Sequence, residues 1–155
     1  MDAENTVQIF DWLWTSGQLS VEDIARLPKL GFRAVINLAL PTSSNALPGE
    51  AEMVTRQGLS YVHIPVLWEQ PAQAQLQQFF AIVQALAPGK VWVHCAMNMR
   101  VSAFVYLYRR LCMGEEDNVA LPTLRQVWEP NATWQCFIDS ALQAGPRPVD
   151  QSVPS

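Results

Sequence analysis

The strongest constraint on the fold is an alternation of two kinds of apolar segment along the chain. Residues 33–40, 61–66 and 91–95 are short runs that are apolar almost throughout, as expected for strands buried on both faces. Other segments carry apolar residues at helical spacing, and they predict helices over 20–27, 50–57, 71–87, 100–112, 116–128 and 131–141. This order predicts a three-layer α/β domain, with a small, mainly parallel sheet flanked by helices.

Local signals mark several of the expected boundaries. Ser20 and Asp23 stand three residues apart, which is typical of a capping box, and Pro28 follows as a stop. Asn131 is placed to cap the last helix, and Gly114 to end the one before Glu115. Residues 12–14 alternate in the manner of a strand.

Length and composition limit the organisation of the chain. Its 155 residues, half of them hydrophobic, suffice for one buried core, so we expect one domain over residues 1–144. The proline-rich end, residues 145–155, predicts a disordered tail. Neither oligomeric state nor the identity of a substrate can be read from this composition.

Charge and cysteine content exclude several classes of function. Ten Lys and Arg against fourteen Asp and Glu give a net charge of −4, which argues against binding to nucleic acid or an anionic membrane. No apolar run approaches the ~20 residues of a membrane span, and the acidic start is not a secretory signal. Three cysteines argue against a disulfide framework and favour a reducing compartment, so we expect a cytoplasmic protein. The sparse His and Cys residues show no metal-ligand spacing, and no glycine-rich nucleotide loop is present.

The segment that predicts chemistry is His-Cys-Ala-Met-Asn-Met-Arg-Val-Ser, residues 94–102. A buried strand is expected to end at Cys95, and a helix to start near Arg100. A loop that enters a helix N-terminus in this way points backbone N–H groups inward and suits an anion. Such surroundings favour the thiolate form of a cysteine, so Cys95 is a candidate nucleophile.

The neighbours of Cys95 supply the other roles. Arg100 can clamp an oxyanion through two parallel hydrogen bonds. Ser102 is placed to bond the thiolate or to ease its departure, and His94 to orient the loop. The backbone N–H groups of the four intervening residues would bind the substrate: Ala96, Met97, Asn98 and Met99. Asn98 also tolerates a left-handed backbone.

This pattern resembles the signature of the cysteine-dependent protein phosphatases, in which His-Cys is followed by five residues, Arg and then Ser or Thr. The similarity is to the compact dual-specificity type and a bacterial branch of it, and it extends over roughly residues 14–142, including 16–23, 31–38, 61–66 and 128–134. The resemblance implies a dual-specificity-phosphatase-like fold and hydrolysis of a phosphorylated substrate, protein or small molecule. It also implies a phosphocysteine intermediate on Cys95 and no cofactor.

The loop departs from that signature in length. Four residues, not five, separate Cys95 from Arg100. A shorter ring around the cysteine resembles the rhodanese sulfurtransferases, in which it holds a persulfide. Sulfur transfer through a Cys95 persulfide therefore remains an alternative, as does a phosphate-binding module without turnover.

A phosphatase also needs a proton donor for the leaving oxygen. The chain has no Asp between Asp23 and Asp117, where the resembling family usually carries one. Glu69 is the nearest replacement, and Trp68 beside it is expected to shield its carboxyl and to offer a stacking surface. His63 is the fallback.

Four further residues are expected to be structural. Cys112 and Cys136 fall on apolar helix stripes, which predicts core packing. The pair at 109–110 predicts a solvated helix end, with Arg109 facing water.

Overall fold

The computed structural model describes residues 1–146, and the tail predicted at 145–155 therefore lies almost wholly outside the described residues. The elements follow in the order β1 (Val7–Phe10), β2 (Leu13–Ser16), α1 (Val21–Arg26), β3 (Phe32–Asn37), α2 (Glu50–Arg56), β4 (Ser60–His63), α3 (Gln73–Leu86), β5 (Lys90–His94), α4 (Met99–Leu111), α5 (Asp117–Val127) and α6 (Ala132–Ala144). Every helix and strand expected from the sequence is present, with ends that differ by a few residues.

The strands form a single sheet in the order β1-β2-β5-β3-β4. Strands β2, β5, β3 and β4 are parallel, and β1 pairs antiparallel with β2 at the edge. Strand β1 was not expected, because only Val7 of its four residues is buried and the apolar alternation is lost. The mainly parallel sheet is confirmed.

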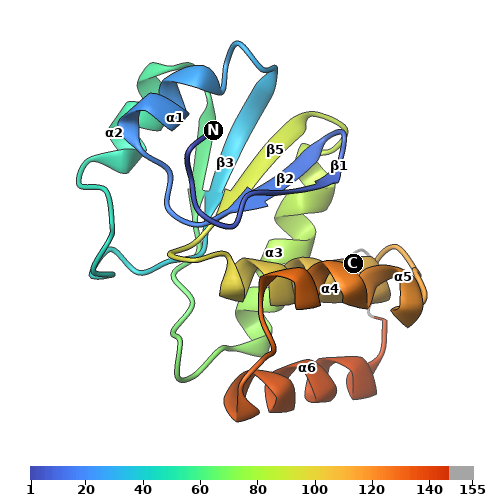
Figure 1. The fold of residues 1–155 in the computed structure, drawn as a ribbon. Helices are drawn as coiled ribbons and strands as arrows, with labels where there is room; N and C mark the ends of the chain where they lie inside the picture. The colour runs from blue at the N-terminus through green and yellow to red at the C-terminus, as the bar shows by residue number, and fades with distance from the viewer. Residues whose placement is uncertain (147–155) are drawn as a thin grey trace, which may run out of the picture.

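Helices cover both faces of this sheet (Figure 1). Helices α1 and α2 lie on one face, while α3 and α4 lie on the other, with α5 and α6 packed against α4. The central strand β5 faces both sides, since Trp92 belongs to the smaller core under α1 and α2, and Val91 and Val93 to the larger one. This double burial explains why the run is apolar throughout.

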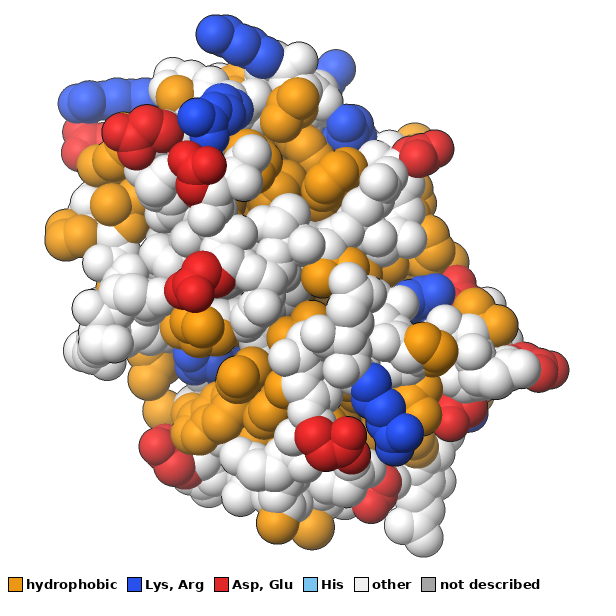
Figure 2. Space-filling model, viewed as in Figure 1, with side chains coloured by type: hydrophobic (Ala, Val, Ile, Leu, Met, Phe, Trp, Pro, Cys, Tyr) orange, Lys and Arg blue, Asp and Glu red, His pale blue; other side chains and the backbone are white. Residues whose placement is uncertain are grey.

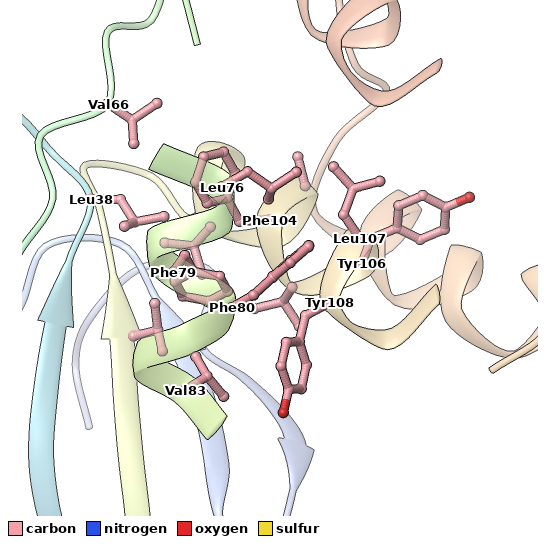
Figure 3. Close-up of a cluster of buried hydrophobic side chains, with 14 of the residues drawn as sticks. Leu38, Val66, Leu76, Phe79, Phe80, Val83, Phe104, Tyr106, Leu107 and Tyr108 are labelled. Carbon is pink, nitrogen blue, oxygen red and sulfur yellow. The ribbon is translucent and has the colours of Figure 1, made fainter. Parts of the chain in front are cut away.

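The larger core lies between the sheet, α3 and α4 (Figure 3). Phe79 and Phe80 of α3 point toward α4, where Phe104 and Tyr108 receive them at ring distances of 5.6 and 5.8 Å. Aromatic contacts of this kind fix the position of α4, whose N-terminus follows Cys95.

Both predicted N-terminal caps are confirmed. Ser20 and Asp23 form a reciprocal capping box on α1, and Asn131 accepts a hydrogen bond from the amide of Trp134 on α6 at 2.9 Å. These caps satisfy amide groups that the helices themselves leave without partners.

Two predictions outside the site are wrong. Cys136 was expected in the core, but it is exposed on α6. Cys112 is half-buried against the larger core, and burial raises the pKa of its thiol to about 11. Arg109 is buried and not solvated, since it pairs with Glu115 at 2.7 Å and its guanidinium lies over the ring of Phe10. Packing of α5 and the edge strand covers this end of α4, which helix periodicity alone does not reveal.

Within residues 1–146, no helix combines the length and the apolar character needed to cross a bilayer.

Candidate active site

Cys95 follows the central strand β5 directly and opens the loop that leads into α4. Its side chain is only 1% exposed, and it lines a pocket of about 230 Å³ at the carboxyl end of the sheet. The other lining residues are Trp68, Ala96, Met97, Met99 and Arg100. Hydrophobic side chains gather over the loops on this side of the molecule (Figure 2). A ligand site at the carboxyl ends of parallel strands is typical of α/β proteins.

Two carbonyl groups of the loop bond to residues that do not line the pocket, and this sets the direction of the amides that follow them. The carbonyl of Cys95 lies 3.1 Å from Nδ1 of His94, and the carbonyl of Ala96 accepts from the amide of Gln18 at 3.1 Å. In a trans peptide the N–H of the following residue points the opposite way. The amides of Ala96 and Met97 therefore point away from His94 and Gln18, neither of which lines the pocket.

Residues outside the loop hold it from behind. Asn45 donates to the carbonyl of Ala96 at 3.1 Å, and Asn5 donates to the carbonyl of Met97 at 2.9 Å. Gly17 packs so closely that a Cβ atom there would lie 2.7 Å from the oxygen of Ala96. Only glycine fits at this contact.

Asn98 has the left-handed backbone expected for it, with φ of 69°. Its buried side chain donates to the carbonyl of Asn5 at 2.7 Å and to Oγ1 of Thr15 at 3.0 Å, so it anchors the loop outside the pocket. Met97 and Met99 line the pocket instead.

Arg100 lies in the first turn of α4 and is 6% exposed. Its Nη1 donates to the carbonyl of Val66 at 2.8 Å, and its guanidinium carbon lies 5.9 Å from the ring centre of Trp68. Its Nε is buried, and no partner for it exists among the described residues. A buried donor without a partner is costly, and an oxyanion in the pocket would satisfy it.

His94 is fully buried behind Cys95, and its ring bridges two elements. Nε2 lies 2.5 Å from Oε2 of Glu50, whose other oxygen accepts from Gln18 at 2.7 Å. Burial raises the pKa of Glu50, but the hydrogen bond and charge of His94, with further bonds from Gln18 and Tyr61, outweigh it and lower that pKa below its ordinary value. Sequence reasoning missed Glu50, since an acidic residue that opens a helix indicates a solvated position.

Ser102 is placed differently from the expectation. Its hydroxyl donates to the carbonyl of Met99 at 2.7 Å and accepts from Nε1 of Trp128 at 3.1 Å. The expected bond to Cys95 is not among the hydrogen bonds of the described residues. Ser102 thus connects the first turn of α4 to the segment after α5.

Glu69 lies on the segment between β4 and α3, one residue from the pocket-lining Trp68, and its carboxyl is exposed. The expectation that Trp68 shields this carboxyl from water is therefore wrong. The indole of Trp68 packs instead against Trp128 and Trp134, at ring distances of 5.2 and 6.0 Å.

Other titratable groups stay apart from the pocket. His63 is exposed, and its Nε2 lies 2.6 Å from the carbonyl of Ala39. Across residues 1–146, no three His, Cys, Asp or Glu side chains come together as a metal site would require.

Comparison with known proteins agrees with this geometry. A family model described as "DSP-PTPase phosphatase fused to NAD+ Kinase" matches residues 2–135. The beta-lactamase hydrolase-like protein of Xylella fastidiosa is 31% identical over 97 residues, which make up 61% of this chain and 22% of that protein. The chain thus spans less than a quarter of the length of the curated relatives it matches.

Solved structures share the fold. A DUF442 phosphatase from Shewanella putrefaciens CN-32 is 32% identical, with a TM-score of 0.84 over 94% of this chain and 93% of that one. The core catalytic domain of the PP-IP phosphatase SIW14 from S. cerevisiae is 16% identical, with a TM-score of 0.74 over 90% and 86% of the two chains. The family model covers most of the chain, and the site described above agrees with it: the chain belongs to the DSP-PTPase phosphatase family.

Proposed function

We propose that the protein hydrolyses phosphomonoesters in two steps through a phosphocysteine on Cys95. The observation that carries this proposal is the buried, unpartnered Nε of Arg100, a residue that lines the same pocket as Cys95. A nucleophile and an oxyanion donor at one small pocket are the two parts that phosphoryl transfer to a thiolate needs.

In the first step the Cys95 thiolate attacks phosphorus, a sulfur–phosphorus bond forms, and the bond from phosphorus to the leaving oxygen breaks. The leaving oxygen takes a proton from Glu69, the only carboxyl group in the segment between β4 and α3. In the second step water loses a proton to the same carboxylate and attacks phosphorus, which releases phosphate and restores the thiolate.

Two sets of groups would stabilise the negative charge on the phosphoryl oxygens. Arg100 approaches from the first turn of α4, held by its bond to the carbonyl of Val66. The amides of Ala96 and Met97, and the positive end of the α4 dipole, approach from the loop. Ser102 would contribute by holding the carbonyl of Met99 and so the start of the helix.

The substrate would be a phosphorylated protein or small molecule. The related TpbA of P. aeruginosa has been solved with phosphotyrosine, and SIW14 is described as a PP-IP phosphatase, so the shared fold is found with both kinds of phosphate compound. The pocket of about 230 Å³ has room for a phosphoryl group and the first atoms beyond it.

The test is turnover of p-nitrophenyl phosphate by the wild type and by Cys95→Ser, with Cys136→Ser as the matched control. Cys95→Ser should lose turnover by at least about 10³-fold, because a hydroxyl is a far weaker nucleophile. Cys136 is exposed on α6, so its variant should keep the wild-type rate. Equal rates for all three proteins would reject the proposal.

The four-residue ring between Cys95 and Arg100 favours one competing function, sulfur transfer. Mass spectrometry after incubation with thiosulfate separates the two. A gain of one sulfur atom on Cys95 would support transfer, whereas a phosphate group trapped on Cys95 in a parallel incubation with a phosphomonoester would support hydrolysis. A protein that binds phosphate but releases no product would be the binding module.

A further inference from the structure

A buried acid–imidazole pair lies directly behind the nucleophile, outside the pocket. His94 and Glu50 are 0% and 6% exposed, and neither lines the pocket of Cys95. The two residues are 44 positions apart in the chain, and Nε2 of His94 lies 2.5 Å from Oε2 of Glu50. The family signature contains the histidine but says nothing of its acidic partner.

The hydrogen-bond partners of the two ring nitrogens bear on where the protons of His94 lie. Nδ1 of His94 faces the carbonyl of Cys95 at 3.1 Å, and a carbonyl can only accept. Nε2 faces the carboxylate of Glu50, which also only accepts when ionised. Both ring nitrogens thus face acceptor oxygens, an arrangement that suits an imidazolium with a proton on each nitrogen.

We propose that Glu50 is a positioning residue for Cys95: its carboxylate keeps His94 doubly protonated, and the charged ring holds the Cys95 carbonyl and favours the thiolate. The inference deepens the proposed function, because it rests on Cys95 being the nucleophile. Glu50 acts only through His94, since it does not line the pocket.

The other side chains that contact Glu50 and His94 carry no charge near neutral pH. Tyr61 of β4 is the other titratable group beside Glu50, and burial together with the negative charge of Glu50 raises its pKa to about 12. Tyr61 therefore stays protonated in any neutral assay. Gln18, after β2, is neutral and holds the second oxygen of Glu50. Cys95 itself is the third neighbour, through its carbonyl.

The informative variant is Glu50→Gln, because it removes charge and keeps size. The new amide can donate to Nε2 of a neutral ring, whose Nδ1 proton still binds the Cys95 carbonyl. The positive charge of a ring that contacts the Cys95 carbonyl is lost, and so is the negative charge of the carboxylate beyond it. Because the ring is nearer to Cys95 than the carboxylate is, the thiolate should become less favourable.

The primary measurement is the rate of Cys95 alkylation by iodoacetamide as a function of pH. In Glu50→Gln the midpoint should rise by about one pH unit. The control is Glu52→Gln on the same helix, an exposed residue that pairs with Arg56 and should leave the midpoint unchanged. A wild-type midpoint in a folded Glu50→Gln protein would overturn the proposal.

Two further measurements cover the remaining outcomes. In a double-mutant cycle, Glu50→Gln should add no shift to a His94→Asn protein, whereas an additive shift would show that Glu50 does not act through the ring.

Should Glu50→Gln fail to fold, ¹⁵N spectra of the wild-type imidazoles decide, since the chain has only two histidines and His63→Gln assigns them. His94 should carry two N–H protons at about pH 7. A single N–H proton would overturn the proposal.

Neither alkylation nor the spectra depend on turnover. A protein without phosphatase activity would reject the proposed function, yet it could still show the predicted shift. The two failures are therefore distinguishable.

Discussion

At the scale of single residues, Arg100 is held in place by its neighbours in the structure. One nitrogen is committed to the carbonyl of Val66, and the aromatic face of Trp68 lies beside the guanidinium. These contacts fix the long side chain, so that less conformational entropy is lost when the remaining nitrogens bind a ligand. The buried Nε is left free for that purpose within the described part of the chain.

Glu69 carries the first prediction. Glu69→Gln should lower kcat for phenyl phosphate about 10²-fold, because that leaving group needs a proton, and should change turnover of p-nitrophenyl phosphate far less. Steady-state rates for the two esters measure the difference. Glu129→Gln, which alters another exposed carboxyl, should leave both rates unchanged. A uniform loss on both esters in Glu69→Gln would instead indicate a role in binding.

Local sequence was sufficient for part of the site. Cys95, His94 and Arg100 follow one another along a strand-to-helix turn, so their proximity is a property of the chain itself. Glu50 could not be predicted, because its contact with His94 depends on how α2 packs on the sheet. The same holds for Ser102, whose hydroxyl is taken by Trp128 from a distant segment.

At the scale of elements, the capping box of α1 ties the start of a short helix to the N-terminal segment. Asp23 accepts from the amide of Ser20 at 3.1 Å and from the amide of Asp2 at 2.8 Å. Burial raises the pKa of Asp23, but these backbone hydrogen bonds outweigh it, so the pKa lies below its ordinary value. A lowered pKa in the folded state means that the ionised carboxyl stabilises the fold.

Asp23→Asn should therefore cost about 1 kcal/mol in the free energy of unfolding at neutral pH. The stabilisation is present above the carboxyl's unfolded pKa of about 4 and is lost as the pH falls through the lower folded value. Urea unfolding across this range should show the two proteins converging in acid. Glu22→Gln, an exposed change in the same turn, should follow the wild type throughout. A difference that persists in acid would contradict the charge argument.

Element prediction succeeded where burial was two-sided and local signals were strong, as in β5 and the caps of α1 and α6. It failed at β1, an edge strand whose pairing is set by β2 and not by its own pattern. Cys136 shows a related limit, because an apolar residue type at helical spacing need not lie on the buried stripe.

At the scale of the whole molecule, a cluster of three tryptophans joins the C-terminal helices to the active site. Nε1 of Trp134, on α6, donates to the carbonyl of Trp68 at 2.8 Å, and Trp128 packs against both rings. The segment that carries Trp68 and Glu69 is thereby held by an element that contributes no residue to the pocket.

Trp134→Phe should therefore lower kcat/KM several-fold while costing about 1–2 kcal/mol in unfolding free energy. The matched control is Trp92→Phe in the smaller core, which also removes a 2.8 Å indole hydrogen bond, there to Ser16. Both variants should lose comparable stability in urea, but only Trp134→Phe should lose activity well below its melting temperature. Equal losses of activity would mean that the cluster acts through global stability alone.

The close contact at Gly17 restricts which residues this position can accept. Because the oxygen of Ala96 is so near, the space behind the loop that follows Cys95 admits no added methyl group unless the backbone shifts. The position of the loop that follows Cys95 is thus set in part by the residue that follows β2, far away in the chain.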